Sequence, residues 1–329
     1  MPTARMSRWL LYSFAAYAFS LTLPAVGYSA PPATVETEVV ENVEAATETD
    51  QTETADEKPA DEVESAESRY IRIRRNDDGE PLGLETSIVR FVPKSGEDGV
   101  VLDLIGAVHV GDTPYYRTLN KEFEKYDVVL YELVAEKGTR VPKGGRKGGD
   151  MFPVEMLKNM LKLDSQLRVV DYSKKNFKHA DMSPADMKKA MEKRGDTGFS
   201  LILGILRDMI RESNRMAARQ AADPNSVPQI SLMDLLFNPD GGKKLRRMMA
   251  MQLGDPAASS ALGETLNTLL VEDRNQAALK VYQEELDKGT KKIAIFYGAA
   301  HMPDFEERLT TQFDMKIESV RWIEAWDLE

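Results

Sequence analysis

Short runs of apolar residues, separated by polar turns, recur along the chain from residue 70 onwards and predict β-strands. The runs at 70–74 and 87–92 alternate with polar residues, and the turn-rich stretch 76–83 between them favours a hairpin. Further strands are predicted at 100–105, 127–133, 167–172, 292–297 and 317–326. The first, second and fourth of these are apolar enough to be buried strands of a parallel sheet.

Helical patterns fill much of the chain between these strands. A helix with Pro114 in its first turn is expected to run to about residue 126, so that the strands before and after it form a parallel β-α-β unit. Ser183 is a good N-cap and opens a long helical region that reaches about residue 289. A last helix is expected at 303–313. Breaks in the long helical region are predicted at 195–196, 222–228 and 238–242.

Together these elements predict an α/β (α+β) fold with a central, largely parallel sheet. A large helical insertion at about 183–289 separates two units that each read strand, Gly-x-x-His, helix. We interpret the glycine-rich segment 137–150 as a mobile loop near the strand ends. The more specific alternative is a phosphate-binding loop, but the glycines of this segment do not have the Walker spacing. The methionines of the helical region are expected to fill a core, and a groove for apolar ligands is the less favoured reading.

Residues 1–30 have the pattern of an export signal. Arg5 and Arg8 form a short basic region, residues 9–26 are almost continuously apolar, and small residues at Ser29 and Ala30 offer a cleavage site. The alternative is an uncleaved N-terminal anchor, because the apolar stretch approaches the length that spans a membrane. Both interpretations place the rest of the chain outside the cytoplasm, in the periplasm or secreted, with a membrane tether in the second case.

The charge of the chain is concentrated in residues 31–68, which carry thirteen acids and a single base. This segment has no aromatic residue, so we expect an acidic, disordered linker that cannot bury enough apolar area to fold. Residues 69–329 are nearly neutral, which argues against a nucleic-acid partner. The chain has no cysteine, which excludes disulfides, thiolate catalysis and cysteine-bound zinc or iron.

Two of the three histidines of the chain stand in the same local context. His109 follows Gly106 after one buried strand, and His301 follows Gly298 after another. Ligands of open α/β sheets gather beyond the carboxyl ends of parallel strands, where glycine permits sharp turns and close approach. We therefore expect the two imidazoles to converge on one site, although 192 residues separate them.

Glu132 is the third element of this predicted site. It follows an apolar strand, where a carboxylate is costly to bury unless it is paired or bound to a metal. His109, Glu132 and His301 would form a three-ligand site for a divalent metal (Mn, Co or Zn) that leaves a position for water. Without a metal, one histidine or Glu132 could act as a general base.

Five further polar residues are candidates for the site or its surroundings. On the helix expected at about 262–288, Asp273 falls in the apolar stripe and Arg274 at its margin, and the periodicity slightly favours Asp273 without deciding between them. We interpret His179 as a surface or capping histidine in a polar loop. Asp112 and Asp304 each follow a motif histidine by three residues, and are either orienters of the imidazoles or helix N-terminal carboxylates.

The paired Gly-x-x-His motifs, Glu132 and the sequence Arg274-Asn275 resemble the TraB/Tiki/GumN family, whose wider clan contains erythromycin esterases and ChaN-like haem-binding proteins. The resemblance covers roughly residues 98–329. It implies an α/β core with a helical insertion and a metal-dependent, peptidase-like hydrolase. By position, His109, Glu132 and His301 would form the metal and water-activating centre, and Arg274 would aid the substrate or transition state.

Two other functions remain open from the sequence. The first is a non-catalytic protein that binds haem or a peptide, as other branches of the clan suggest, with tyrosines near the motifs as haem ligands. The second is a structural envelope protein that the acidic segment spaces from the membrane. The candidate haem ligands are Tyr115, Tyr116, Tyr131 and Tyr297.

Overall fold

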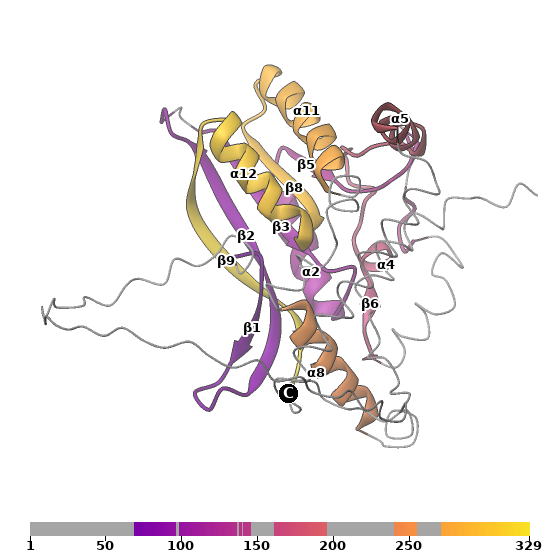
Figure 1. Ribbon diagram of the computed structural model, residues 1–329. Helices are drawn as coiled ribbons and strands as arrows, with labels where there is room; N and C mark the ends of the chain where they lie inside the picture. The colour runs from indigo at the N-terminus through magenta and orange to yellow at the C-terminus, as the bar shows by residue number, and fades with distance from the viewer. Residues whose placement is uncertain are drawn as a thin grey trace, which may run out of the picture. The chain divides into compact units, whose positions relative to one another are not determined.

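A mixed β-sheet organises the part of the chain that the computed structural model describes (Figure 1). The described residues are 69–96, 99–136, 138–139, 141–145, 161–195, 240–254 and 271–329. The expected export signal, the acidic linker and much of the glycine-rich loop and helical insertion lie outside them. Within these ranges, no helix is both long and apolar enough to cross a membrane.

Four parallel strands form the half of the sheet that carries the predicted site. Their order is β3 (Val101–Ala107), β8 (Lys292–Gly298), β5 (Val128–Tyr131) and β7 (Phe177–His179). The α/β class is therefore confirmed. The strands before and after the first helix are parallel, as the predicted β-α-β unit requires, but they are not neighbours, because β8 lies between β3 and β5.

The other half of the sheet is antiparallel and is built around the long strand β2 (Pro81–Pro93). One edge of β2 pairs first with β1 (Ile71–Arg75), as the hairpin prediction requires, and then with β3. Its other edge pairs with β9 (Met315–Asp327) along most of its length. A separate two-stranded sheet joins β4 (Val110–Gly111) to β6 (Asp164–Ser165).

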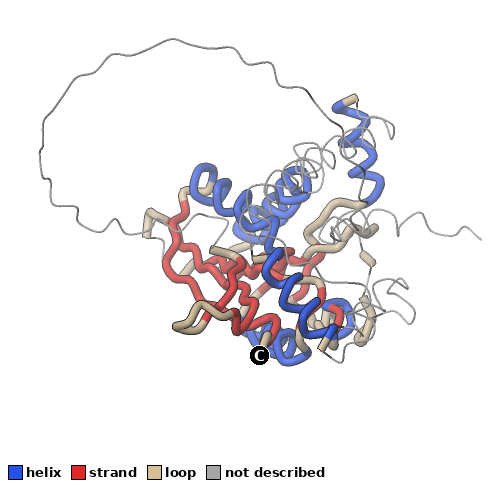
Figure 2. The backbone as a smooth tube through the Cα atoms, turned by 60° about the horizontal axis from the view of Figure 1, so that its bottom comes forward, coloured by secondary structure: helices blue, strands red, loops and turns tan. Residues whose placement is uncertain are grey.

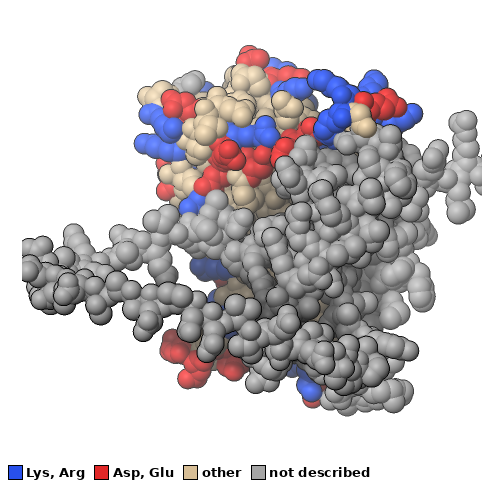
Figure 3. Space-filling model, viewed as in Figure 1, with Lys and Arg blue, Asp and Glu red and all other residues tan. Residues whose placement is uncertain are grey.

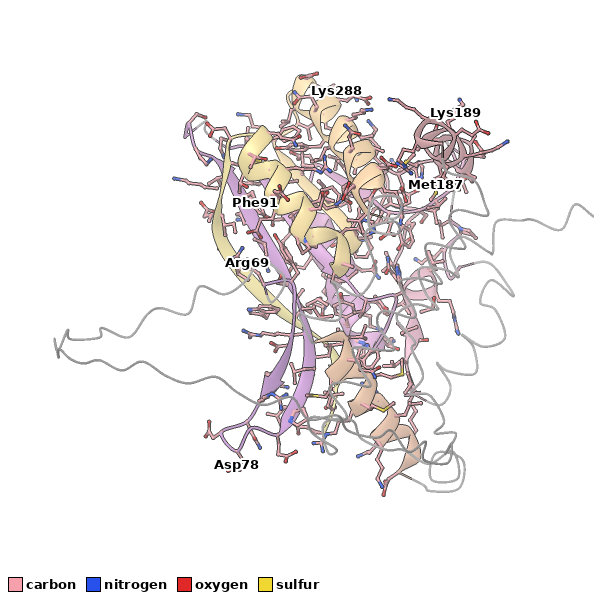
Figure 4. The ribbon with its side chains drawn as sticks, viewed as in Figure 1. Arg69, Asp78, Phe91, Met187, Lys189 and Lys288 are labelled. Carbon is pink, nitrogen blue, oxygen red and sulfur yellow. The ribbon has the colours of Figure 1, made fainter. Side chains whose placement is uncertain are left out.

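The helices cover both faces of the sheet (Figure 2). Alternate strand residues point to opposite sides, so the core divides into two clusters. One cluster packs the strands against α2 and α8, and the other packs them against α11 and α12. Phe91 of β2, labelled in Figure 4, is fully buried in the second cluster. The helices are α2 (Thr113–Glu122), η1 (Phe123–Lys125), α4 (Gln166–Val169), α5 (Pro184–Arg194), α8 (Gly241–Leu253), α11 (Asp273–Asp287), η4 (Ala299–His301) and α12 (Met302–Gln312).

Local sequence signals explain where α5 begins and ends. The Ser183 hydroxyl accepts a hydrogen bond from the Asp186 N–H, and the Asp186 carboxylate accepts from the Ser183 N–H, which completes a capping box. Gly195 ends the helix in the left-handed conformation that favours glycine. Along the chain, α5, α8 and α11 follow β7 and precede β8, as expected for the helical insertion.

The strand predicted at 167–172 is wrong, because α4 occupies the first half of that segment and the chain leaves the helix at Val170 without forming a strand. The side chain of Asn120 donates to the carbonyl of Val169 and accepts from the N–H of Asp171. These bonds hold the backbone in a turn that apolar alternation alone does not predict. The strand forms instead at β7, a few residues further along the chain.

Replacement of Ile295, at the middle of β8, tests this packing directly. The Ile295→Ala variant should lower the free energy of unfolding by about 2–5 kcal/mol, because the side chain is fully buried against α11 and α12. Val281→Ala, at the partly buried edge of the same cluster, should cost less. Urea unfolding followed by circular dichroism measures both, and equal losses would contradict the packing.

Candidate active site

The parallel strands end at one edge of the sheet, and polar side chains follow each of them. His109 comes two residues after β3, His301 three residues after β8, Glu132 directly after β5, and Asp181 two residues after β7. Because β8 lies between β3 and β5, the residues that follow it have neighbours on both sides. This edge is the usual place for ligands in an open α/β sheet.

Three of the predicted site residues meet around Gly298, the last residue of β8. A methyl group placed on Gly298 would lie 3.5 Å from Oε2 of Glu132, 3.8 Å from Nε2 of His109 and 3.8 Å from Cδ2 of His301. The expected convergence of two distant imidazoles and one carboxylate is therefore present in the structure.

The two Gly-x-x-His motifs are not equivalent, although their sequences match. In the parallel pairing of β3 and β8, Gly298 lies opposite Ala107 rather than opposite Gly106. His301 lies in the short helix η4 and is buried, whereas His109 lies in a bend before β4 and is exposed. The site thus has one imidazole in its wall and one on its solvent side.

Hydrogen bonds to both of its oxygens hold the carboxylate of Glu132. The N–H of Gly298 donates to Oε2 at 2.8 Å, and Nη2 of Arg274 donates to Oε1 at 2.6 Å. Burial alone would raise the pKa of Glu132. The positive charge of Arg274, with His301, His109 and the Gly298 N–H, outweighs burial and holds this pKa well below its usual range. Glu132 is therefore ionised at neutral pH.

Arg274 binds a second carboxylate besides Glu132. Its Nε and Nη2 donate to the two oxygens of Asp181 at 3.0 and 2.6 Å. The Arg274 side chain is 5% exposed and that of Asp181 is 0% exposed, so one guanidinium pairs with two carboxylates that are mostly or wholly buried. Asp181 was missed because the sequence places it in a polar loop and gives no sign of the short strand β7 before it or of its burial.

The structure shows which of the two charged residues at the start of α11 faces the protein interior. Arg274 lies on the buried face of the helix, whereas Asp273 forms an ion pair with Arg194 at the end of α5. The slight preference of the periodicity for Asp273 is therefore wrong. The buried face of α11 is rotated by one residue from the predicted stripe and consists of Arg274, Asn275, Ala278, Leu279, Tyr282 and Glu285.

Asn275, next to Arg274, holds His301. Its side-chain oxygen lies 2.7 Å from Nδ1 of His301, and the other ring nitrogen, Nε2, lies 3.7 Å from Oε1 of Glu132. Burial lowers the pKa of His301 to about 4, although the charge of Glu132 opposes this. His301 is therefore neutral at physiological pH.

The three remaining polar candidates have structural contacts. His179 ends β7 rather than lying in a loop, and its Nε2 is 2.6 Å from the carbonyl oxygen of Leu133. Asp112 pairs with Arg246 of α8. Asp304 accepts from Asn275 and Arg308, so it contacts the residue that holds His301 and not the imidazole itself.

Three of the four tyrosines considered as haem ligands have hydroxyl groups bound within the core. The Tyr115 hydroxyl bonds with the Thr86 hydroxyl, while those of Tyr116 and Tyr297 donate to backbone carbonyls. Burial raises the pKa of Tyr115, Tyr131 and Tyr297, which disfavours the phenolate that haem iron binds. These contacts give no support to haem ligation by this set.

Across the described ranges, no three His, Asp or Glu side chains are already grouped as metal ligands.

Comparisons with protein-family models, with curated proteins and with solved structures find no match to this chain. In Figure 3, Lys and Arg side chains are interspersed with Asp and Glu on the visible described surface.

Replacement of Arg274 by methionine should destabilise the protein by about 3–5 kcal/mol at neutral pH, because it leaves two buried carboxylates without their cation. In the wild type, the ion pair of Arg274 with Glu132 makes its full contribution to the free energy of unfolding at pH values above the ordinary carboxyl pKa. This contribution is lost as the pH falls through the lowered pKa of Glu132. In Arg274→Met the buried carboxylate prefers its proton, so the deficit should shrink as the pH falls from 7 towards 4.

Urea unfolding at several pH values measures this deficit. Asp273→Ala is the matched control, since Asp273 directly precedes Arg274 and its ion pair with Arg194 is partly exposed. A deficit that grows on acidification, or an Asp273 variant as unstable as the Arg274 variant, would contradict the assignment.

The lowered pKa of His301 leads to a separate prediction about how the free energy of unfolding depends on pH. Between about 4 and the ordinary value of 6.5, the unfolded chain binds a proton at this residue that the folded chain does not. The free energy of unfolding should therefore fall as the pH drops through this window, by up to about 1.4 kcal/mol per pH unit, and should keep its full value above it. His301→Gln should remove this part of the slope, and an unchanged slope in the variant would contradict the shifted pKa.

Proposed function

We propose that this protein is an exported, peptidase-like hydrolase that uses water as the nucleophile at the site formed by His109, Glu132 and His301. The observation that carries the proposal is the convergence of these three side chains around Gly298. The resemblance of the two Gly-x-x-His motifs and Arg274-Asn275 to the TraB/Tiki/GumN family supports the same reaction class.

Glu132 and His301 supply the proton-accepting groups of the proposed reaction. Oε1 of Glu132 and Nε2 of His301 are 3.7 Å apart, too far for a good direct hydrogen bond but close enough to contact the same water molecule. A water that donates to the carboxylate and to the imidazole loses proton density to both, which makes its oxygen a better nucleophile. His109 faces the same point from the solvent side, where a substrate enters.

Arg274 is a positioning residue in this proposal. It touches Glu132 and Asp181 inside the protein, and its side chain is almost fully buried. It keeps Glu132 ionised and fixes the direction of the carboxylate, and it acts on the substrate through Glu132. This role is narrower than the contact with substrate or transition state that the sequence suggested.

A divalent metal ion is part of the proposal. Two imidazole nitrogens and a carboxylate oxygen are donors that suit Zn, Mn or Co, and Glu132 keeps lone pairs that its two hydrogen bonds do not use. Nε2 of His109, the carboxylate of Glu132 and Nε2 of His301 would hold the ion. When bound, such an ion lowers the pKa of water at the site and polarises a carbonyl group.

The pattern of residues 1–30 supports an exported location. We propose a peptide or a small molecule as substrate, and a periplasmic or secreted protein, with a membrane tether if residues 1–30 stay attached. The nearly neutral charge of residues 69–329 gives no reason to propose a nucleic-acid substrate.

Hydrolysis of a fluorogenic peptide library by the purified full chain tests the function. Glu132→Gln, His109→Ala and His301→Ala should each reduce the rate by at least about a hundredfold, since each removes a group that contacts the reacting water or the metal. His179→Gln is the matched control, because the third histidine of the chain bonds to a backbone carbonyl. Wild-type rates in both the His109 and the His301 variants would contradict the proposal.

The metal is tested in the same assay after treatment with a chelator. Loss of activity that Mn, Co or Zn restores supports a metal-assisted site. Full activity after chelation, with no ion detected by elemental analysis, would contradict the proposal that a metal ion takes part. The proposed hydrolase would then use Glu132 and His301 as general bases. No hydrolysis by the wild type with any of the three ions would contradict the peptidase itself.

A further inference from the structure

The side chain of Asn275 can be oriented in only one way by its neighbours. Its nitrogen Nδ2 lies 2.9 Å from the carbonyl oxygen of His301 and 2.7 Å from a carboxylate oxygen of Asp304. Both partners only accept hydrogen bonds, so this atom must be the NH2 group and not the oxygen. The amide oxygen of Asn275 therefore faces Nδ1 of His301, at 2.7 Å.

This orientation determines which ring nitrogen of His301 carries the proton. An amide oxygen accepts hydrogen bonds and cannot donate one, so Nδ1 must be the N–H. Because a neutral imidazole has one N–H, Nε2 then presents its lone pair. Nε2 is also the nitrogen on the side of Glu132.

Glu132 alone would favour the opposite tautomer. Its ionised carboxylate lies 3.7 Å from Nε2 and would be better satisfied by an N–H at that position than by a lone pair. The proton on Nδ1 is therefore held against this preference by the hydrogen bond to Asn275. Two acceptors consequently face each other across the site, 3.7 Å apart, and a water or a cation placed between them would satisfy both.

Two further residues fix Asn275. Asp304 accepts from Asn275 and from Nε of Arg308 on the next turn of α12, at 2.7 and 2.8 Å. Asn275 itself is completely buried. The NH2 group of Asn275 is thus held by a carboxylate that an arginine neutralises, and the amide cannot turn over without loss of two bonds.

We propose that Asn275 is a positioning residue which keeps the proton of His301 on Nδ1 and so directs the lone pair of Nε2 at Glu132. The consequence for catalysis rests on the proposed function, since a base or a metal ligand at Nε2 needs this lone pair. The tautomer itself is a property of the folded chain and holds whether or not the chain hydrolyses peptides.

Long-range proton–nitrogen correlation spectra of the full chain, labelled with 15N-histidine, report the tautomer directly. The chain has three histidines, and single replacements of His109 and His179 assign the signals. At neutral pH and without added metal, His301 should show a protonated Nδ1 and an unprotonated Nε2. A protonated Nε2 in the wild type would overturn the proposal.

Two variants separate the oxygen of Asn275 from its NH2 group. Asn275→Ala removes both, and the proton should move to Nε2, with hydrolysis reduced by about 10–100-fold. The double variant Asn275→Asp, Asp304→Asn keeps an oxygen acceptor opposite Nδ1 and supplies an amide donor from position 304. It should keep the Nδ1 tautomer and restore part of the activity, although it also loses the bond to the His301 carbonyl.

Asn176→Ala is the matched control, because Asn176 also donates two hydrogen bonds from its side-chain amide, and it donates both to backbone carbonyls rather than to a histidine or its neighbours. It should leave the His301 tautomer unchanged. An Nδ1 proton that persists in Asn275→Ala would overturn the proposal, and so would a double variant with the same tautomer as the alanine variant. An Nδ1 tautomer that depends on Asn275 in a chain without hydrolase activity would support this inference and contradict the proposed function.

Discussion

The buried guanidinium of Arg274 is the interaction on which the candidate site depends. Its single positive charge is shared by Glu132 and Asp181, which follow two adjacent parallel strands and whose side chains are 11% and 0% exposed. Carboxylates in such positions are costly unless a cation accompanies them. The helix that supplies the cation, α11, lies at the end of the helical insertion and returns the chain to the sheet directly before β8. Arg274 and the neighbouring Asn275 thus tie α11 to the strand ends.

The topology of the sheet explains why residues so distant in sequence meet. β8 comes last among the parallel strands along the chain but lies between β3 and β5 in space. Gly298 at its end therefore borders both Glu132 and His109, and His301 follows three residues later. Arg274 and Asn275, which are adjacent on α11, hold the two groups that face each other, Glu132 and His301. One helix turn thereby sets both the charge of the carboxylate and the direction of the imidazole.

Much of this arrangement was predictable from the sequence, because the signals are local. Gly-x-x-His after a buried strand indicates a strand-end histidine, and Glu132 at the end of an apolar run indicates a carboxylate with a special partner. The features that were missed depend on tertiary contacts. The turn of α4 requires the side chain of Asn120, and the choice of Arg274 over Asp273 requires the actual rotation of α11. Strand order, which places β8 between its neighbours, has no local signal.

A high-resolution crystal structure of the protein at neutral pH, with anomalous scattering data, tests the central claim most directly. The account predicts that Arg274 contacts both Glu132 and Asp181, and that a solvent molecule or a metal ion lies between the carboxylate of Glu132 and Nε2 of His301 with His109 facing the same point. A direct, short hydrogen bond between Nε2 of His301 and Glu132 would contradict it. So would an Arg274 side chain that points away from the two carboxylates.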